Sequence, residues 1–144
     1  PFMIESSEES FRFLEELSQS EFANVKERRR NITLFECDQK SPIGFVQIKA
    51  QISKKLSHSA YLRLGVLNSY QSQGTGKRLF QAAEKLLHPS VEMLYALCRS
   101  DNIKALQFFH KLSFQQVAFL EKDIKEGQMY HDNLLLRKFV SHGK

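Results

Sequence analysis

Hydrophobic and polar residues alternate along this chain with two periods, one typical of strands and one typical of helices. Residues 31–37 and 43–52 place apolar side chains at loosely alternating positions on either side of a polar turn, which predicts two strands paired as a hairpin. Residues 60–67 form a third segment of strand length. In residues 75–87 and 102–112 the apolar side chains recur three and four positions apart, as in a helix that packs one face on a core.

The two ends of the chain add further strands and helices. Ser6 and Glu9 have the spacing of a capping box, and the apolar side chains that follow them predict a helix. The other expected elements are a short strand at 2–4, a short helix at 21–29, and strands at 91–98, 114–121 and 129–139, the last two flanking a turn at 122–128. A hairpin, two strand–helix units and a final hairpin indicate an α/β chain, more closely an α+β mixed sheet with helices on its faces. The length favours a single domain over residues 1–144.

Composition excludes several classes of protein. Of the 144 residues, 42% are hydrophobic and 26% are charged, which is ordinary for a globular chain and unlike disordered or fibrous proteins. No apolar run is long enough to span a bilayer, so no membrane contact is expected. The two cysteines are too few for a disulfide scaffold, and the five histidines show no metal-ligand spacing. A cytoplasmic protein without a metal is therefore predicted.

Charge is distributed unevenly around the net value of +5. Residues 39–83 contain seven bases and no Asp or Glu, whereas residues 1–38 contain nine acids and five bases. A long stretch without a carboxylate favours an anionic ligand, although a solvated basic face gives the same pattern. Nucleic acid is a second anion to consider. However, the bases are scattered and no helix-turn-helix or ribonucleoprotein signature is present, so no nucleic acid partner is expected.

The segment between the third strand and the first long helix carries the chemistry. It reads Gln71-Ser72-Gln73-Gly74-Thr75-Gly76 and is followed by Lys77 and Arg78. Glycines let successive backbone N–H groups turn toward one point, and the start of a helix adds unpaired donors and a partial positive charge. Such a loop is a cradle for phosphate. It lacks the Gly-Lys-Ser/Thr of a Walker A loop and the spacing of a dinucleotide-binding fingerprint, and by itself a glycine-rich turn is the alternative.

The residues around this loop make it resemble the central signature of the GNAT superfamily of N-acetyltransferases. In that signature a strand ends in Val, here Val66, and a short loop leads into Arg/Gln-x-x-Gly-x-Gly/Ala and a helix. A second family pattern, Asn, then Ala, then Phe-Tyr-x-Lys-x-Gly-Phe, is matched by Asn102, Ala105, Phe108, Phe109, Lys111 and Phe114. Two positions depart from it, since Phe109 stands for the Tyr and Ser113 for the Gly. A weaker likeness at Gly127, Tyr130 and Asp132 extends the resemblance over most of residues 2–140.

The resemblance implies a GNAT-like fold and a co-substrate. The sheet would be mixed, mostly antiparallel and six- to seven-stranded, splayed between its fourth strand at 60–66 and its fifth at 91–98, with about four helices on both faces. Acetyl-coenzyme A (acetyl-CoA) would lie in the wedge between these two strands. The resemblance assigns to it the backbone of Leu64 and Val66, the start of the loop at Gln71 and Ser72, the amides of Gln73, Gly74, Thr75, Gly76 and Lys77, and the residues Asn102 and Phe109.

The resemblance also suggests catalytic groups. The N–H of Val66 would polarise the thioester carbonyl as an oxyanion donor. Because the phenyl ring of Phe109 donates no proton, Tyr130 or Tyr95 is a candidate to protonate the departing thiolate. His58 is a candidate base on the fourth strand, on the same side as the residues before Val66 and subject to a bulge there. A solvated loop histidine is the alternative interpretation of His58.

These features predict an N-acetyltransferase that moves an acetyl group from acetyl-CoA to a primary amine by direct attack on the thioester. Glu36 and Asp132 lie on strands that would line the acceptor side, and ordered water is the remaining route for the amine proton. The substitution at Phe109 leaves an alternative, a regulatory module that binds acyl-CoA without catalysis. The acceptor amine is left open among a metabolite, a polyamine, an antibiotic and a protein amine. The oligomeric state is also left open, with a homodimer as one possibility.

Overall fold

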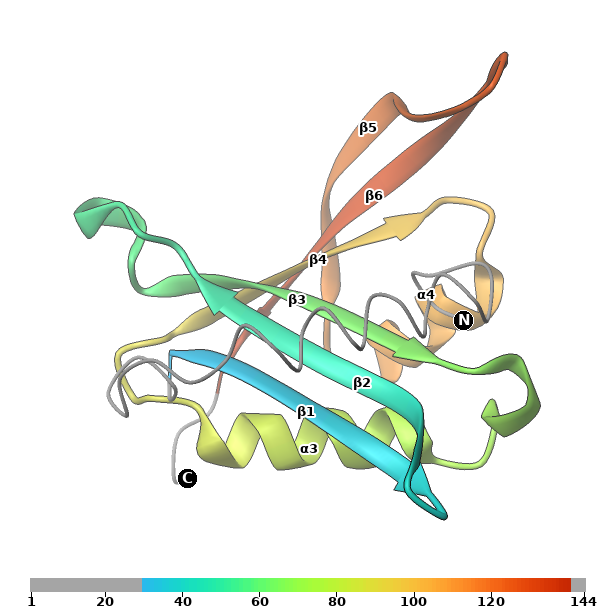
Figure 1. Ribbon diagram of the computed structural model, residues 1–144. Helices are drawn as coiled ribbons and strands as arrows, with labels where there is room; N and C mark the ends of the chain where they lie inside the picture. Colours follow the sequence, from blue (N-terminus) through green and yellow to red (C-terminus); the bar gives the residue numbers. More distant parts are fainter. Residues whose placement is uncertain (1–29, 141–144) are drawn as a thin grey trace.

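The computed structural model describes residues 30–140 as a six-stranded sheet with two α-helices (Figure 1). The strands are β1 (Asn31–Asp38), β2 (Ser41–Ala50), β3 (Ser59–Val66), β4 (Met93–Arg99), β5 (Gln115–Glu126) and β6 (Met129–Phe139). The helices are α3 (Thr75–Leu86) and α4 (Ile103–Lys111), and two short 3-10 turns, η1 (Lys54–Leu56) and η2 (Asn68–Tyr70), flank β3. The strand and the two helices expected before residue 30 lie outside the described residues.

The sheet is mixed and mostly antiparallel, as the family resemblance implies. Its strand order is β1-β2-β3-β4-β6-β5, and all neighbours are antiparallel except β3 and β4. The two predicted hairpins, β1–β2 and β5–β6, form its edges. The strand–helix–strand–helix segment between them supplies the two central strands, so the glycine loop that follows β3 lies at the middle of the sheet.

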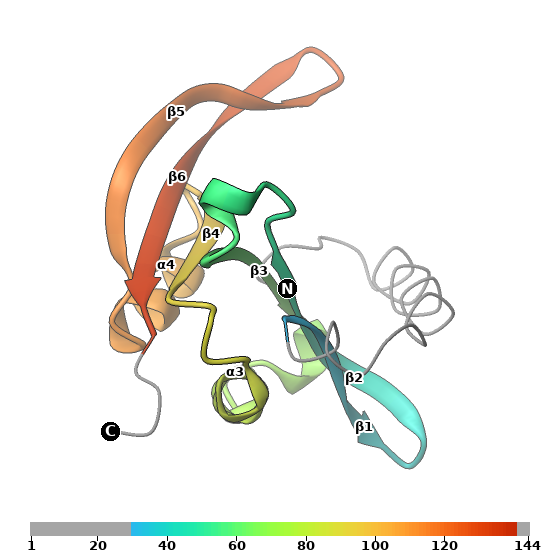
Figure 2. The same cartoon turned by 90° about the vertical axis from the view of Figure 1, so that its left-hand side faces the viewer.

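Both described helices pack on one face of the sheet (Figure 2). The even-numbered side chains of β3 are buried on that face: Ala60, Leu62, Leu64 and Val66. They share one apolar core with Leu79, Phe80 and Ala83 of α3 and with Ala105 and Phe109 of α4. The expectation of about four helices on both faces is therefore not confirmed. Residues 30–140 contain two, because the other predicted helices belong to the N-terminal residues that are not described.

Helix α4 ends in a left-handed turn at Ser113. The Ser113 N–H donates to the His110 carbonyl at 3.0 Å, and the Phe114 N–H donates to the Phe109 carbonyl at 3.0 Å. The rings of Phe109 and Phe114 lie 5.2 Å apart, which completes a Schellman motif. Ser113 has a φ of 72°, a conformation that costs an L-residue about 1–2 kcal/mol. The departure from glycine at this position therefore places strain at the end of α4.

The β5–β6 hairpin is longer than the sequence predicts. The pattern indicates a turn at 122–128, whereas β5 continues to Glu126. A bulge leaves residues 121–123 opposite Asp132, whose carboxylate accepts a hydrogen bond from the Lys122 N–H at 2.8 Å. This cross-strand bond extends the strand through a segment of loop-like composition, and the hairpin arches away from the sheet (Figure 2).

Replacing Ser113 by glycine tests the strain in the turn after α4. We expect Ser113→Gly to raise the free energy of unfolding by about 1 kcal/mol, because glycine has no Cβ to oppose a positive φ. Urea denaturation followed by circular dichroism measures the change. Ser113→Val is the matched control, since a β-branched side chain tolerates this φ less well and should lower the same free energy. Equal stability of the two variants would contradict the assignment of strain to Ser113.

Candidate functional site

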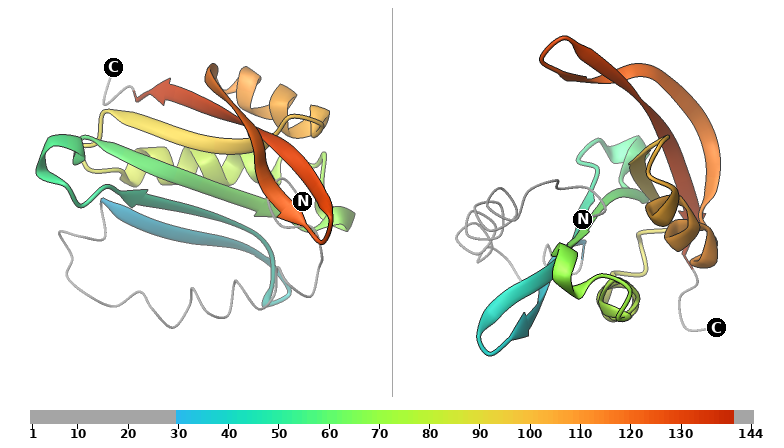
Figure 3. Two further views of the ribbon diagram at one scale, coloured as in Figure 1. Left: turned by 90° about the horizontal axis from the view of Figure 1, so that it is seen from above. Right: turned by 90° about the vertical axis from the view of Figure 1, so that its right-hand side faces the viewer.

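Strands β3 and β4 separate after a short parallel pairing. Residues 59–61 pair with residues 93–95, and the last pair joins Tyr61 to Tyr95. Among the described strands, β3 from residue 62 to Val66 pairs with β2 alone, without a shift in register. The bulge expected in this strand is therefore absent. Figure 3 shows β3 and β4 diverging toward their C-terminal ends, and we call the region beyond Tyr61 and Tyr95 the β3–β4 opening.

The backbone of β3 directs Val66 and Leu64 toward this opening. The Leu67 N–H donates to the Ile43 carbonyl of β2 at 2.8 Å, so the odd-numbered peptide groups at this end of β3 face β2. Successive residues of a strand direct their peptide groups to opposite sides. The even-numbered groups therefore face β4, as the hydrogen bonds from the start of β4 to the His58 carbonyl also show. The peptide groups of Val66 and Leu64 thus lie where β4 has moved away.

The loop after β3 presents an array of backbone N–H groups, which we call the anion cradle (the N–H groups of residues 73–77). Within residues 30–140, these N–H groups donate to no protein acceptor. Ser72 and Gly74 have φ values of 64° and 83°, so the chain passes through left-handed conformations into α3. Gly74 is the N-cap of α3, which leaves the first turn without intrahelical acceptors. These donors and the positive end of the helix dipole suit an anion.

Gly76 packs closely against α4. A Cβ at this position would lie 3.0 Å from Cε1 of Phe108, so the Phe108 ring would have to shift by a few tenths of an ångström. Gly76 is buried, whereas Gln73, Gly74 and Lys77 are exposed. The solvent-facing side of the anion cradle is therefore formed by Gln73, Gly74 and Lys77.

A carboxylate from β1 reaches the loop on the same face of the sheet as α3. Glu36 accepts hydrogen bonds from Nε and Nη2 of Arg78 at 2.9 and 2.7 Å, and from the Thr75 hydroxyl at 3.2 Å. Hydrogen bonding to Arg78 holds the pKa of Glu36 below its usual range, and the carboxylate in turn raises the pKa of Arg78. Glu36 therefore contacts the loop and α3 and does not take the acceptor-side position that the sequence suggested.

Two more side chains fix the beginning of the loop. The Tyr70 hydroxyl donates to the Asp38 carboxylate at the end of β1, at 2.7 Å. Nε2 of Gln71 donates to the Val66 carbonyl at 3.2 Å and to the Asn68 side chain at 3.3 Å. Of the two Val66 peptide groups that face the opening, the carbonyl thus already has a donor. The loop is tied to β1 and to β3 before it enters the anion cradle.

His58 lies at the opposite end of β3 from Val66, and Tyr130 lies near the tip of the β5–β6 hairpin. His58 precedes β3, at the closed end of the opening, and an extended strand places it about 26 Å from Val66 at about 3.3 Å per residue. Tyr130 is exposed near the start of β6, where Nζ of Lys122 and of Lys125 lie 5.7 and 5.4 Å from its ring centre. The structure therefore does not bring either predicted residue to the anion cradle or to Val66.

Asn102 and Phe109 have structural partners in this fold. Asn102 is the N-cap of α4, and its Oδ1 accepts a hydrogen bond from the Ala105 N–H at 3.2 Å. Phe109 is 0% exposed, with ring centres 5.3 Å from Phe108 and 5.2 Å from Phe114. Phe109 therefore belongs to the core here. The half-buried Phe108 is the ring next to Gly76 of the anion cradle, whereas the resemblance assigned the cofactor contact to Phe109.

Two tyrosines mark the closed end of the β3–β4 opening. The ring centres of Tyr61 and Tyr95 lie 5.5 Å apart with a tilt of 31°. Both belong to the odd-numbered positions, which face away from the apolar core. Tyr61 is 43% exposed and Tyr95 is half-buried. Of the tyrosines that the sequence offered as proton donors, Tyr95 is the one at this opening.

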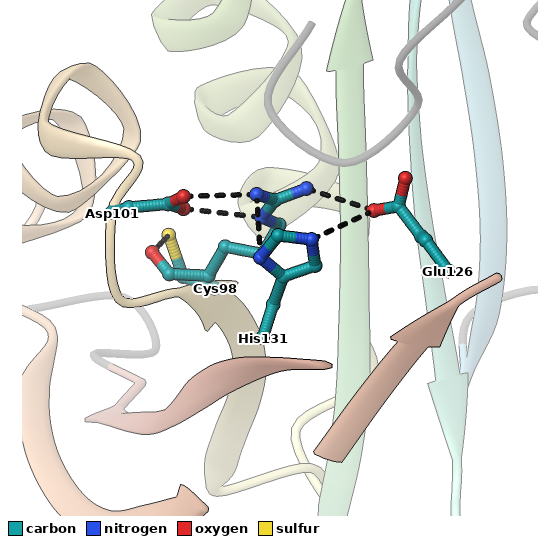
Figure 4. A network of polar contacts seen from close by, with 5 residues as sticks. Cys98, Asp101, Glu126 and His131 are labelled. Atoms are coloured by element: carbon teal, nitrogen blue, oxygen red, sulfur yellow. Dashed lines mark hydrogen bonds and ion pairs between the residues drawn. The ribbon is translucent and has the colours of Figure 1, made fainter. Parts of the chain in front are cut away.

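A polar network joins the C-terminal end of β4 to the arched hairpin (Figure 4). Arg99 donates to Asp101 at 2.9 and 3.1 Å, to Glu126 at 3.0 Å and to Nδ1 of His131 at 3.1 Å. Because an arginine can only donate, Nδ1 must accept, and a neutral His131 carries its proton on Nε2, which lies 3.6 Å from Glu126. Nδ1 of His131 is thus engaged by Arg99, so His131 connects β4 to the hairpin.

Within residues 30–140, no group of three or more His, Cys, Asp or Glu side chains is arranged to hold a metal ion. No helix in the same residues is long and apolar enough to cross a membrane.

The chain is similar in fold to solved acetyltransferases. An acetyltransferase of the GNAT family from Streptococcus pneumoniae matches with a TM-score of 0.72 at 22% identity, covering 96% of this chain and 78% of that one. A ribosomal-protein-alanine N-acetyltransferase from Brucella melitensis has a TM-score of 0.71 at 16% identity, covering 95% and 80%. The yncA protein of Salmonella typhimurium, solved with its cofactor acetyl-CoA, has a TM-score of 0.70 at 14% identity, covering 79% and 68%. At these identities the likeness shows the fold alone.

Sequence comparison settles the family. Among curated proteins no match to the chain is found. The model of the Acetyltransferase (GNAT) family matches residues 2–114, which is most of the chain and includes β3, the anion cradle and α4. The chain therefore belongs to the GNAT family of acetyltransferases.

Proposed function

We propose that this GNAT family member is an N-acetyltransferase that moves an acetyl group from acetyl-CoA to a primary amine. The observation that carries the proposal is the anion cradle of residues 73–77 at the mouth of the β3–β4 opening. The cradle offers donors for a diphosphate, and the adjoining edge of β3 offers peptide groups for an extended amide-containing arm.

The diphosphate, the pantetheine arm and the thioester of acetyl-CoA each have a matching group in the described chain. The N–H groups of residues 73–77 and the ammonium of Lys77 suit the diphosphate, because several donors and a positive charge converge there. The peptide groups of Leu64 and Val66 suit the amides of the pantetheine arm. The Val66 N–H, which is directed into the opening, is our proposed donor to the thioester carbonyl oxygen.

The reaction needs a neutral amine and a proton for the departing thiolate. Attack of the amine nitrogen on the thioester carbonyl forms the amide bond and breaks the C–S bond, and the sulfur leaves with the bonding electron pair. Tyr95 is our candidate to return a proton to that sulfur through ordered water, because it lies at the opening and its partner Tyr61 is about 16 Å from Val66 along β3, nearer than His58. Ordered water is proposed to take the amine proton, since His58 is far from Val66 along β3.

Direct transfer is favoured over an acetyl-cysteine intermediate. Cys98 lies near the end of β4 but is only 2% exposed, and burial raises the pKa of its thiol to about 11. The thiolate is the nucleophilic form of cysteine, and it is scarce at neutral pH when the pKa is this high. Cys98 is therefore a poor candidate for a nucleophile that would carry the acetyl group.

The alternative of a module that binds acyl-CoA without catalysis is not favoured. This alternative rested on the loss of a proton donor at Phe109. Membership of an acetyltransferase family and the presence of Tyr95 at the opening both weaken that argument. Turnover decides between the two. The purified protein is given acetyl-CoA and a panel of amino acids, polyamines, aminoglycosides and peptides with free N-termini, and free thiol is measured. Amine-dependent thiol release supports the enzyme, whereas acetyl-CoA binding without release for any amine would support the module.

Gly74→Glu tests the anion cradle. Gly74 is exposed with a φ of 83°, so a glutamate adds backbone strain and a negative charge beside the proposed diphosphate site. We expect the affinity for acetyl-CoA, measured by calorimetry, to fall by at least about tenfold. Gly74→Asn is the control, because asparagine tolerates positive φ and adds no charge. Unchanged affinity of Gly74→Glu would remove the loop from the site. Gly76→Glu is unsuitable, since Gly76 is buried against Phe108 and the change would disturb packing.

Tyr95→Phe tests the proposed proton donor. The change removes the hydroxyl and keeps the ring beside Tyr61, so we expect kcat to fall by about a hundredfold while KM for acetyl-CoA stays the same. Tyr130→Phe is the matched control and should leave kcat unchanged, because Tyr130 lies near the start of β6. Similar kcat values for both variants would exclude the Tyr95 hydroxyl from the reaction.

Cys98→Ala tests direct transfer. Because the Cys98 thiol is buried and its pKa is raised, we expect turnover with the best amine to stay within about twofold of the unaltered protein. Mass spectrometry of the unaltered protein incubated with acetyl-CoA alone provides the second measurement. An acetyl group found on Cys98, together with lost turnover in the variant, would establish a covalent intermediate instead.

A further inference from the structure

Glu36 places a negative charge next to the anion cradle. Its carboxylate contacts Arg78 at 2.7 and 2.9 Å and the Thr75 hydroxyl at 3.2 Å, and the N–H of Thr75 is part of the cradle. An uncompensated carboxylate this close would repel a diphosphate. The bidentate guanidinium of Arg78 compensates it, so the pair adds little net charge to the site.

Arg78 also fixes the direction of one peptide group in the loop. Its Nη1 donates to the Gln73 carbonyl at 3.0 Å. A trans peptide unit is planar, and its C=O and N–H point in opposite directions. Because the Gln73 carbonyl is held toward Arg78, the N–H of Gly74 is turned away from Arg78. Nη2 of Arg78 donates to the Thr75 hydroxyl at 3.2 Å as well, so one side chain holds the loop on both sides of Gly74.

We propose that Glu36 and Arg78 are positioning residues that hold the anion cradle in the conformation that binds the diphosphate of acetyl-CoA, an inference that rests on the proposed function. Arg78 acts on the loop and not on the ligand. The exposed Lys77 supplies the positive charge that the ligand meets. Thr75, which is 2% exposed, joins the carboxylate to the first turn of α3. Strand β1 thereby shapes a site made by residues about 39 positions later in the chain.

Glu36→Gln distinguishes a positioning role of Arg78 from a ligand role by the sign of its effect. If Arg78 positions the loop, losing the carboxylate loosens the guanidinium, and binding weakens although the variant is more positive. If Arg78 binds the diphosphate itself, removing the nearby carboxylate frees it, and binding tightens. Calorimetric titration with acetyl-CoA should show a Kd about three- to tenfold higher for Glu36→Gln. Arg78→Lys keeps the charge but loses the fork, and its Kd should rise by a similar factor.

Salt dependence separates the two roles a second time. An exposed charge that meets an anion is screened by salt, so Lys77→Ala should flatten the dependence of log Kd on log salt concentration. The double variant Glu36→Gln/Arg78→Gln preserves the net charge. It should therefore keep the slope of the unaltered protein while its Kd rises. A slope flattened as in Lys77→Ala would assign Arg78 to the ligand.

Tighter binding by Glu36→Gln, or an unchanged Kd for Arg78→Lys, would overturn the proposal. A measurement without ligand separates it from the proposed function. In amide NMR spectra of the free protein, both variants should shift the resonances of Gly74 and Thr75, with thermal unfolding confirming that each is folded. Unshifted resonances would overturn the positioning role. Shifted resonances in a protein whose unaltered form binds no acetyl-CoA would mean that the proposed function is wrong, while the effect of Glu36 on the loop stands.

Discussion

The separation of β3 from β4 is the constraint on which the rest of the structure depends. The two strands pair only as far as Tyr61 and Tyr95, and beyond that point β2 is the only described strand that pairs with β3. Peptide groups inside a sheet need hydrogen-bond partners, so a strand that loses one neighbour must satisfy these groups in another way. Here the edge directs Val66 toward the opening, and the chain leaves β3 directly into the loop that starts α3. The proposed arm site and the anion cradle are both consequences of this one departure from a regular sheet.

The electrostatics of the cradle come from pairing between distant segments. The stretch of residues 39–83 has no acid, which suggested an anionic ligand. In the fold, however, β1 brings Glu36 to Arg78 and Asp38 to Tyr70. Of the two basic residues at the start of α3, Lys77 and Arg78, Arg78 is therefore already paired with a carboxylate. The count of charges along the sequence pointed to the region of the anion cradle. The net charge beside the cradle, however, depends on which acidic and basic side chains pair in the fold.

The arched hairpin illustrates how polar contacts override local composition. Residues 121–123 look like a turn, yet the Asp132 carboxylate binds the Lys122 N–H and keeps the bulged strand in place. At the other end, Arg99 binds both Glu126 and His131. These bonds connect residues across the hairpin and β4, so a pattern read over a few neighbouring positions contains no trace of them.

The sequence by itself determined the type and order of the elements between residues 31 and 139, the glycine loop and the family. Periodicity, turn residues and motif spacing are properties of neighbouring residues, so they can be recognised without knowing the tertiary contacts. Only the tertiary structure decided which side chains lie close together in space. His58 and Val66 belong to one strand region but lie at its opposite ends, whereas Glu36 and Arg78, 42 residues apart, form a bidentate pair. The physical reason is that contacts follow strand register and helix packing, which the whole core sets together.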